Sequence, residues 1–177
     1  MSTRNALCVL SLAMALASTT AFAQTPGLGK PVSEADLAAW DISVMPDGTG
    51  LPPGRGTAVE GARVYAEKCS ACHGENGRNP AAAGAGPMVS GPIAGIEGPK
   101  TIGSFYGYST IVFDFVRRAM PFNMPRTLTN DEVYAVTAYL LAINKIIGEN
   151  DAMNAETLPK VKMPNRDNFI IRFPDRI

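Results

Sequence analysis

The segment Cys69–His73 reads CSACH, with two cysteines three positions apart and a histidine directly after the second. Two cysteines at this spacing on one helical turn face the same way, so both can form thioether bonds to the vinyl groups of one porphyrin. The adjacent histidine then lies under the ring and offers an imidazole nitrogen to the iron. C-x-x-C-H is the attachment signal for c-type haem. The motif therefore predicts a fold built around one covalent haem c.

Residues 1–23 have the pattern of a secretory signal peptide. Ala6–Ala17 is apolar but too short to span a bilayer, and a small-x-small cleavage site, AFA, ends at Ala23. We expect cleavage near this point and a mature chain in the periplasm. The leader would take Cys8 with it, which leaves Cys69 and Cys72 as the mature cysteines beside a single histidine.

Charge and hydropathy argue against two classes of partner. The leader carries Arg4 and no acidic residue, so its removal changes the formal charge from 0 to −1. A chain with this balance has no electrostatic reason to bind nucleic acid or an anionic membrane surface. No later segment is apolar enough for a membrane anchor. The mature chain of about 150 residues is long enough for one domain with its own core.

Other interpretations of the CSACH segment are weaker. A structural zinc site needs four ligands, usually Cys or His, and the mature chain offers only Cys69, Cys72 and His73. A thioredoxin-like C-x-x-C needs a βαβ context, for which the sequence has no pattern. A disulfide between the two cysteines would close a very small loop, contribute little stability and leave the histidine without a role.

The rest of the chain divides into an arm, a domain and a tail. Residues 24–56 are rich in Gly and Pro and predict an extended arm, interrupted by a short helix at Glu34–Trp40 with Ser33 as its N-cap. Residues 57–148 form the expected haem domain, and residues 149–177 a polar tail. No segment alternates as a strand does, so the predicted fold class is all-α.

Three helices are expected within the domain. The first covers residues 57–70, where apolar residues recur at helical spacing. The second covers Thr110–Met120. The third starts at a capping box, Thr129–Glu132, and should run to about Ile147, where Gly148 would close it.

Residues 74–103 are mostly Gly, Ala and Pro, and they lack periodicity. A loop of this length is unusual in a compact domain unless it encloses something. A covalently held porphyrin is a large, flat and mainly apolar object for such a loop to cover. The haem hypothesis therefore also explains the loop.

The second axial ligand of the iron must come from another residue type, because the only histidine is already used. Methionine is the usual partner in cytochromes c. Met120 and Met124 lie in the irregular link between the second and third helices, and each precedes a proline that can hold its thioether in place. The residues themselves leave both as candidates. Of the other methionines, Met88 is expected in the pocket wall, Met45 and Met163 in arm or tail packing, and Met153 at the surface.

Two further positions are candidates for contact with the haem. A ligating histidine normally donates its second N–H to a carbonyl or carboxylate, and we expect the backbone carbonyl of Pro87 to accept it from His73; the alternative is that this proline only shapes the loop. The segment Phe105–Tyr108 would supply pocket walls and, through Tyr106, a hydroxyl for a propionate. Core packing is the alternative role of these aromatic residues.

Together these features resemble a class I cytochrome c: C-x-x-C-H after a first helix, a Gly-Pro loop, a Met-Pro pair and a capped last helix. Longer strings narrow the resemblance. AAWDISVMPDGTGLPPGRGT, TIGSFYGYSTIVFDFVRRAMPF, LTNDEVYAVTAYLLAIN and VKMPNRDNFI resemble the cytochrome c subunit of the bacterial sulfur-oxidising (Sox) sulfane dehydrogenase. They are also similar to the cytochromes paired with sulfite-oxidising molybdoenzymes. The resemblance spans nearly the whole mature chain.

The resemblance implies an all-α class I cytochrome c fold and an electron-transfer protein that is not itself an enzyme. Its partners would be a molybdenum-containing dehydrogenase subunit, which donates electrons one at a time, and a downstream cytochrome c. In that family RRAMPF is the string that bears the methionine ligand, which favours Met120 over Met124. The Sox subunit often carries a second haem domain, whereas this sequence has one C-x-x-C-H. A subunit of a sulfite dehydrogenase complex is therefore the expected role.

Two other functions are compatible with the motif. A general periplasmic carrier would serve another dehydrogenase or a terminal oxidase. A ligand-binding haem protein would need an open iron position, which a nearby methionine argues against.

Overall fold

The computed structural model describes residues 27–89 and 100–169, so the predicted leader lies outside the described residues. Contacts divide the chain into two units, Met1–Asp41 and Ile42–Ile177. The described element of the first unit is helix α2, Glu34–Trp40. Ser33 caps it through a capping box with Asp36, which confirms the predicted helix and its start.

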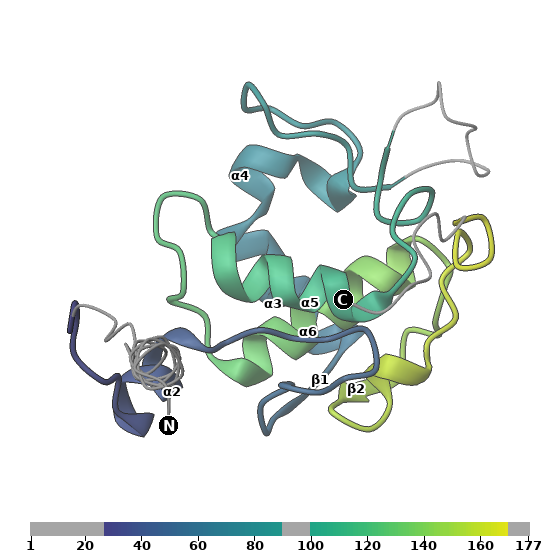
Figure 1. The fold of residues 1–177 in the computed structure, drawn as a ribbon. Coiled ribbons are helices and arrows are strands. Elements are labelled where there is room, and N and C mark those ends of the chain that lie inside the picture. Colours follow the sequence, from purple (N-terminus) through teal and green to yellow (C-terminus); the bar gives the residue numbers. More distant parts are fainter. Residues whose placement is uncertain (1–26, 90–99, 170–177) are drawn as a thin grey trace, which may run out of the picture. The chain divides into compact units, whose positions relative to one another are not determined.

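The second unit is mainly helical, with two very short strands (Figure 1). Its elements are β1 (Arg55–Thr57), α3 (Ala58–Lys68), α4 (Ser70–His73), the 3₁₀ turn η2 (Glu75–Gly77), α5 (Ser109–Ala119), α6 (Asn130–Ile143), β2 (Ala152–Asn154) and the 3₁₀ turn η3 (Leu158–Lys160). Helices α3, α5 and α6 form the centre of this unit. Helix α4 lies at one end and the strand pair at the other (Figure 1).

Strands β1 and β2 pair antiparallel, with Gly56 opposite Met153. The sequence predicted no strand, because three residues are too few for alternation to be recognised. The pairing also corrects the expectation that Met153 lies at the surface. Its side chain is 4% exposed and belongs to the core.

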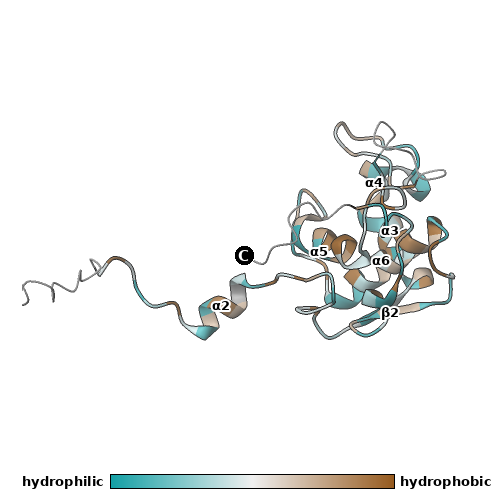
Figure 2. Ribbon diagram, turned by 45° about the vertical axis from the view of Figure 1, so that its right-hand side comes forward, coloured by the Kyte–Doolittle hydropathy of each residue, from teal (hydrophilic) through white to brown (hydrophobic). Residues whose placement is uncertain are grey.

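Helix α6 runs through the core. Val133–Ala138, Leu140 and Leu141 are all buried, so the helix is covered on nearly every side. Figure 2 shows hydrophobic segments among the central helices of this unit. Its start agrees with the predicted capping box, in which Thr129 accepts a hydrogen bond from the backbone N–H of Glu132.

The predicted end of this helix, near Ile147, is wrong because the helix stops at Ile143. Lys145 adopts a left-handed conformation with φ of 60°. Its backbone N–H donates to the Ala142 carbonyl, and the next N–H, of Ile146, donates to the Leu141 carbonyl. These two bonds form a Schellman motif, which satisfies the last carbonyls and ends the helix.

Helix α3 packs closely against α6, and Gly61 makes this approach possible. A Cβ at this position would collide with the backbone carbonyl of Ala135. Across the same contact, Lys68 forms an ion pair with Glu132. The start of α3 is also fixed by a capping box, between Thr57 and Glu60.

Helix α5 lies one residue earlier than the predicted Thr110–Met120. It buries Val112, Phe113 and Val116, and the Phe113 ring stacks at a tilt on Tyr134 of α6, with centroids 4.5 Å apart. This contact joins α5 to the core, whereas Phe115, two residues further on and so on the other side of the helix, is half exposed.

Candidate functional site

Cys69 is the junction between α3 and α4, and its backbone (φ −124°, ψ −38°) interrupts the helical geometry. The backbone N–H groups of Cys72 and His73 both donate to the Cys69 carbonyl, at 3.2 and 3.0 Å. The three predicted haem residues therefore occupy one tight turn. Cys69 is half-buried, Cys72 is exposed, and the two thiols form no disulfide. The arrangement agrees with attachment of both cysteines to one porphyrin.

Hydrogen bonds from α3 and from the loop after His73 hold this turn in place. The Tyr65 hydroxyl donates to the Gly74 carbonyl at 3.0 Å, and burial raises the pKa of Tyr65 to about 12, so it stays a donor. Gly74 has φ of 75°, and a Cβ there would meet the backbone of Asn79. The Cys72 carbonyl accepts hydrogen bonds from the backbone N–H groups of Ala81 and Ala82. The position of His73 is thus set by backbone geometry.

His73 is half-buried, and its Nδ1 atom is buried without a hydrogen-bond partner among the described residues. Burial lowers the pKa of this imidazole, and the Gly86 backbone opposes that shift. The missing hydrogen bond and the effect of Gly86 on the pKa have one explanation. The Gly86 backbone lies near the ring but is not aligned with Nδ1 well enough for a full hydrogen bond. Neutral imidazole is the form that binds a metal.

His73 faces a cavity of about 240 Å³. The cavity is lined by residues of α4, the following loop, the segment before α5, α5 itself and α6: His73, Gly84, Ala85, Gly86, Pro87, Met88, Lys100, Thr101, Ile102, Tyr106, Val112, Phe115, Val116, Met120 and Leu140. Most of these are apolar, which suits the face of a porphyrin.

The structure brings His73, Pro87, Tyr106 and Met120 of the predicted site to this one cavity. Met120 is half-buried and follows α5 directly, with its backbone N–H donating to the Val116 carbonyl at 3.1 Å. Met124 is 55% exposed and does not line the cavity.

Several wall residues were missed from the sequence although a signal was present. Val112, Phe115 and Val116 lie at i, i+3 and i+4 and so share one face of α5, which continues to Met120. Ile111 lies one turn before Phe115, but it is 38% exposed and is not among the residues that line the cavity.

The residues present fit a c-type haem better than a metal ion bound directly by the protein. Within residues 27–89 and 100–169, no group of three or more His, Cys, Asp or Glu could hold a metal ion. The site instead brings one imidazole and one thioether to the lining of an apolar cavity, beside two cysteines on a single turn. That donor set suits an iron whose other four ligands come from a porphyrin.

Of the helices in the described part of the chain, none combines the length and apolar character that a membrane span requires.

Comparisons with known proteins point to one family. The family model described as cytochrome c matches residues 58–144. The solved structure of the sulfane dehydrogenase SoxCD from Paracoccus pantotrophus is similar to this chain, with a TM-score of 0.75 and 35% sequence identity. That match covers 85% of this chain and 73% of the other chain. Among curated proteins, none matches the chain significantly.

Proposed function

The chain belongs to the cytochrome c family, and from this we propose that it carries single electrons in the periplasm for a molybdenum-containing dehydrogenase of sulfite or another sulfur compound. Members of this family bind covalent haem c, and the chain is an electron-transfer cytochrome. The observation that carries the finer proposal is the 35% identity to sulfane dehydrogenase SoxCD over 85% of the chain. That extent includes segments outside the matched haem domain, residues 58–144.

We assign the roles at the site as follows. Cys69 and Cys72 would hold the porphyrin through thioether bonds, and His73 and Met120 would be the protein ligands of its iron. When bound, the haem supplies a one-electron couple. With two protein ligands on the iron, small molecules would find no free site there, and this favours electron transfer over ligand chemistry.

The surrounding residues support this role by fixing the two ligands. The buried Nδ1–H of His73 would donate to a backbone carbonyl of the Gly86–Pro87 segment, and this bond would hold the ring orientation. Tyr106 is half-buried in the cavity wall and brings a hydroxyl for a propionate. Apolar residues of α5 and α6 keep water from the ring, which limits solvent reorganisation when the charge changes.

The proposed partner is tested by electron delivery. The mature protein is mixed, oxidised, with the molybdenum-containing dehydrogenase of the same host and with sulfite, and the haem absorbance is followed. We expect rapid reduction that requires both the dehydrogenase and its substrate. Equal reduction by unrelated periplasmic dehydrogenases would instead support a general carrier.

A further inference from the structure

The segment Thr101–Tyr108, here called the wall loop, forms one side of the haem cavity through Thr101, Ile102 and Tyr106. It contains no helix or strand. Its internal bonds are local: the Thr101 and Ser104 hydroxyls lie 3.0 Å apart, and the Phe105 N–H donates to the Thr101 carbonyl. A wall built this way needs support from elsewhere to keep one conformation.

That support comes from the tail. Residues 158–169, here called the tail clamp, are anchored by the fully buried side chains of Leu158 and Met163. The hydroxyl of Ser109, the first residue of α5, donates a hydrogen bond of 2.6 Å to the carbonyl of the anchored Leu158. The Asn165 side chain donates to the Phe105 carbonyl at 2.7 Å. These bonds hold both ends of the Phe105–Ser109 segment.

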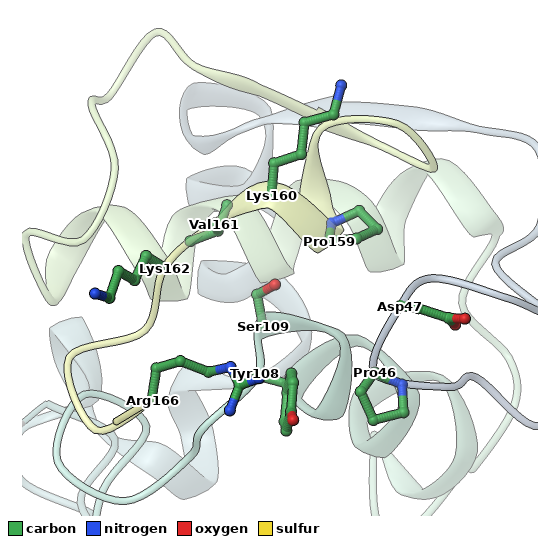
Figure 3. A pocket seen from close by; sticks show the side chains of 9 residues that line it. All are labelled: Pro46, Asp47, Tyr108, Ser109, Pro159, Lys160, Val161, Lys162 and Arg166. Carbon is green, nitrogen blue, oxygen red and sulfur yellow. The ribbon is translucent and has the colours of Figure 1, made fainter. Parts of the chain in front are cut away.

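Between those two bonds, the clamp makes a further contact with the wall loop through Arg166. The Arg166 guanidinium lies over the Tyr108 ring, 4.1 Å from its centroid. Figure 3 shows Arg166 turned toward Tyr108, while Lys160 and Lys162 extend away from the start of α5. The basic residues of the clamp therefore do not converge on a common ligand, and Arg166 acts on the wall loop instead.

Phe169 makes the remaining contacts between the tail clamp and the wall loop. Its ring meets Phe105 edge-on, with centroids 6.2 Å apart, and it also lies directly against Gly107. A Cβ at Gly107 would come within 2.9 Å of the Phe169 ring, so a larger residue there would push the ring away from its present position. The clamp thus contacts Phe105, Gly107, Tyr108 and the following serine, and skips the one residue of this run that lines the haem cavity, Tyr106.

We propose that Asn165, Arg166 and Phe169 are positioning residues for the haem. By fixing the backbone on both sides of Tyr106, they hold its side chain against the cofactor and keep water from that edge of the cavity. The potential of a haem depends on burial and on nearby hydrogen-bond donors. Oxidised haem carries one more positive charge than reduced haem, so water that enters favours the oxidised state. A loosened clamp should therefore lower the reduction potential. The inference rests on the proposed electron-transfer function at this cavity.

The test is a redox titration of the mature haem protein. Asn165→Ala and Phe169→Ala should each lower the potential, whereas Lys162→Ala should leave it unchanged. Lys162 is the matched control, because it lies in the same segment and pairs with Asp167 at the surface. Thermal unfolding of each variant is measured in parallel, so that lost stability is distinguished from a changed haem environment.

The route through Tyr106 is tested by repeating Asn165→Ala in a Tyr106→Ala background, which removes the whole side chain that the clamp is proposed to place. If the clamp acts through that side chain, the shift caused by Asn165→Ala should shrink or vanish there. An undiminished shift, or a lower melting temperature with an unchanged potential, would overturn the positioning role while the proposed function stands. A wild-type protein without attached haem would overturn both.

Discussion

His73 and Met120 line the same cavity from two different elements, the one at the end of α4 and the other directly after α5. They are 47 positions apart in the sequence, and the packing of α5 against α6 brings them together. Met124 is only four residues further on but lies outside this cavity. The arrangement favours Met120, from the first of the two Met-Pro pairs, as the second ligand of an iron held by His73.

The first prediction concerns this choice. Met120→Ala should abolish the weak near-red absorption band of the oxidised protein, which reports a bond between sulfur and iron. It should also lower the reduction potential, because methionine ligation raises it. Met124→Ala is the matched control and should keep both properties. The reverse pattern would move the ligand by four residues and leave the haem function in place.

The second prediction concerns the haem as part of the core. Replacing Cys69 and Cys72 together with Ala should give a protein that fails to hold its cavity wall and is rapidly cut by proteases. The apolar cavity side chains would then lack the group that covers them. Limited proteolysis and thermal unfolding measure this, with Cys8→Ala as the control because that residue belongs to the predicted leader. Normal stability of the double variant would contradict a structural role for the haem.

The third prediction concerns the contact between α3 and α6. Gly61→Ala should destabilise the protein by about 1–3 kcal/mol, because the new Cβ meets the Ala135 backbone and the helices must separate. Gly27→Ala is the control, since a Cβ there meets nothing within 4 Å. Chemical denaturation with the haem attached compares the two. An unchanged free energy of unfolding for Gly61→Ala would show that the contact is looser than described.

The fourth prediction concerns pH. The pKa of Glu132 lies below its ordinary value of 4.5, mainly because Lys68 donates a hydrogen bond to the carboxylate. A hydrogen bond from the Thr129 backbone lowers the pKa further. Because the folded-state pKa is the lower one, the carboxylate stabilises the fold fully above pH 4.5, and this contribution is lost as the pH falls through the folded-state pKa.

Glu132→Gln keeps the capping geometry but removes the charge. We expect it to be less stable than the wild type by on the order of 1 kcal/mol at pH 7, since the ion pair is partly exposed. The difference should narrow as the pH falls toward 3. Denaturation at several pH values checks this, with Glu149→Gln, an exposed acid outside the helices, as the control. A difference that is constant with pH would exclude the charge as its cause.

Features encoded by neighbouring residues were predictable from the sequence. The capping residues Ser33 and Thr129 start α2 and α6 as expected, because a cap needs only a side chain and a backbone N–H three residues away. The C-x-x-C-H turn is local in the same sense. The all-α cytochrome c fold is confirmed by the family match and by three central helices.

Features that depend on distant contacts were not predictable. Helix α6 ends through a left-handed Lys145, whereas the sequence rule points to Gly148. Strand β2 exists only because it pairs with β1, almost 100 residues earlier. The Asn165 bond to Phe105 spans 60 residues and leaves no local pattern. The ligand roles of Met120, Pro87 and Tyr106 stay predictions, although all three residues line the cavity.

The most direct test of an electron carrier with both axial positions closed is exposure of the reduced wild-type protein to carbon monoxide. His73 and Met120 line one cavity, and with both bound to the iron no position is open to the gas. The account predicts a visible spectrum that does not change at neutral pH. Rapid formation of the carbon monoxide complex would contradict it and would indicate a haem protein that binds ligands.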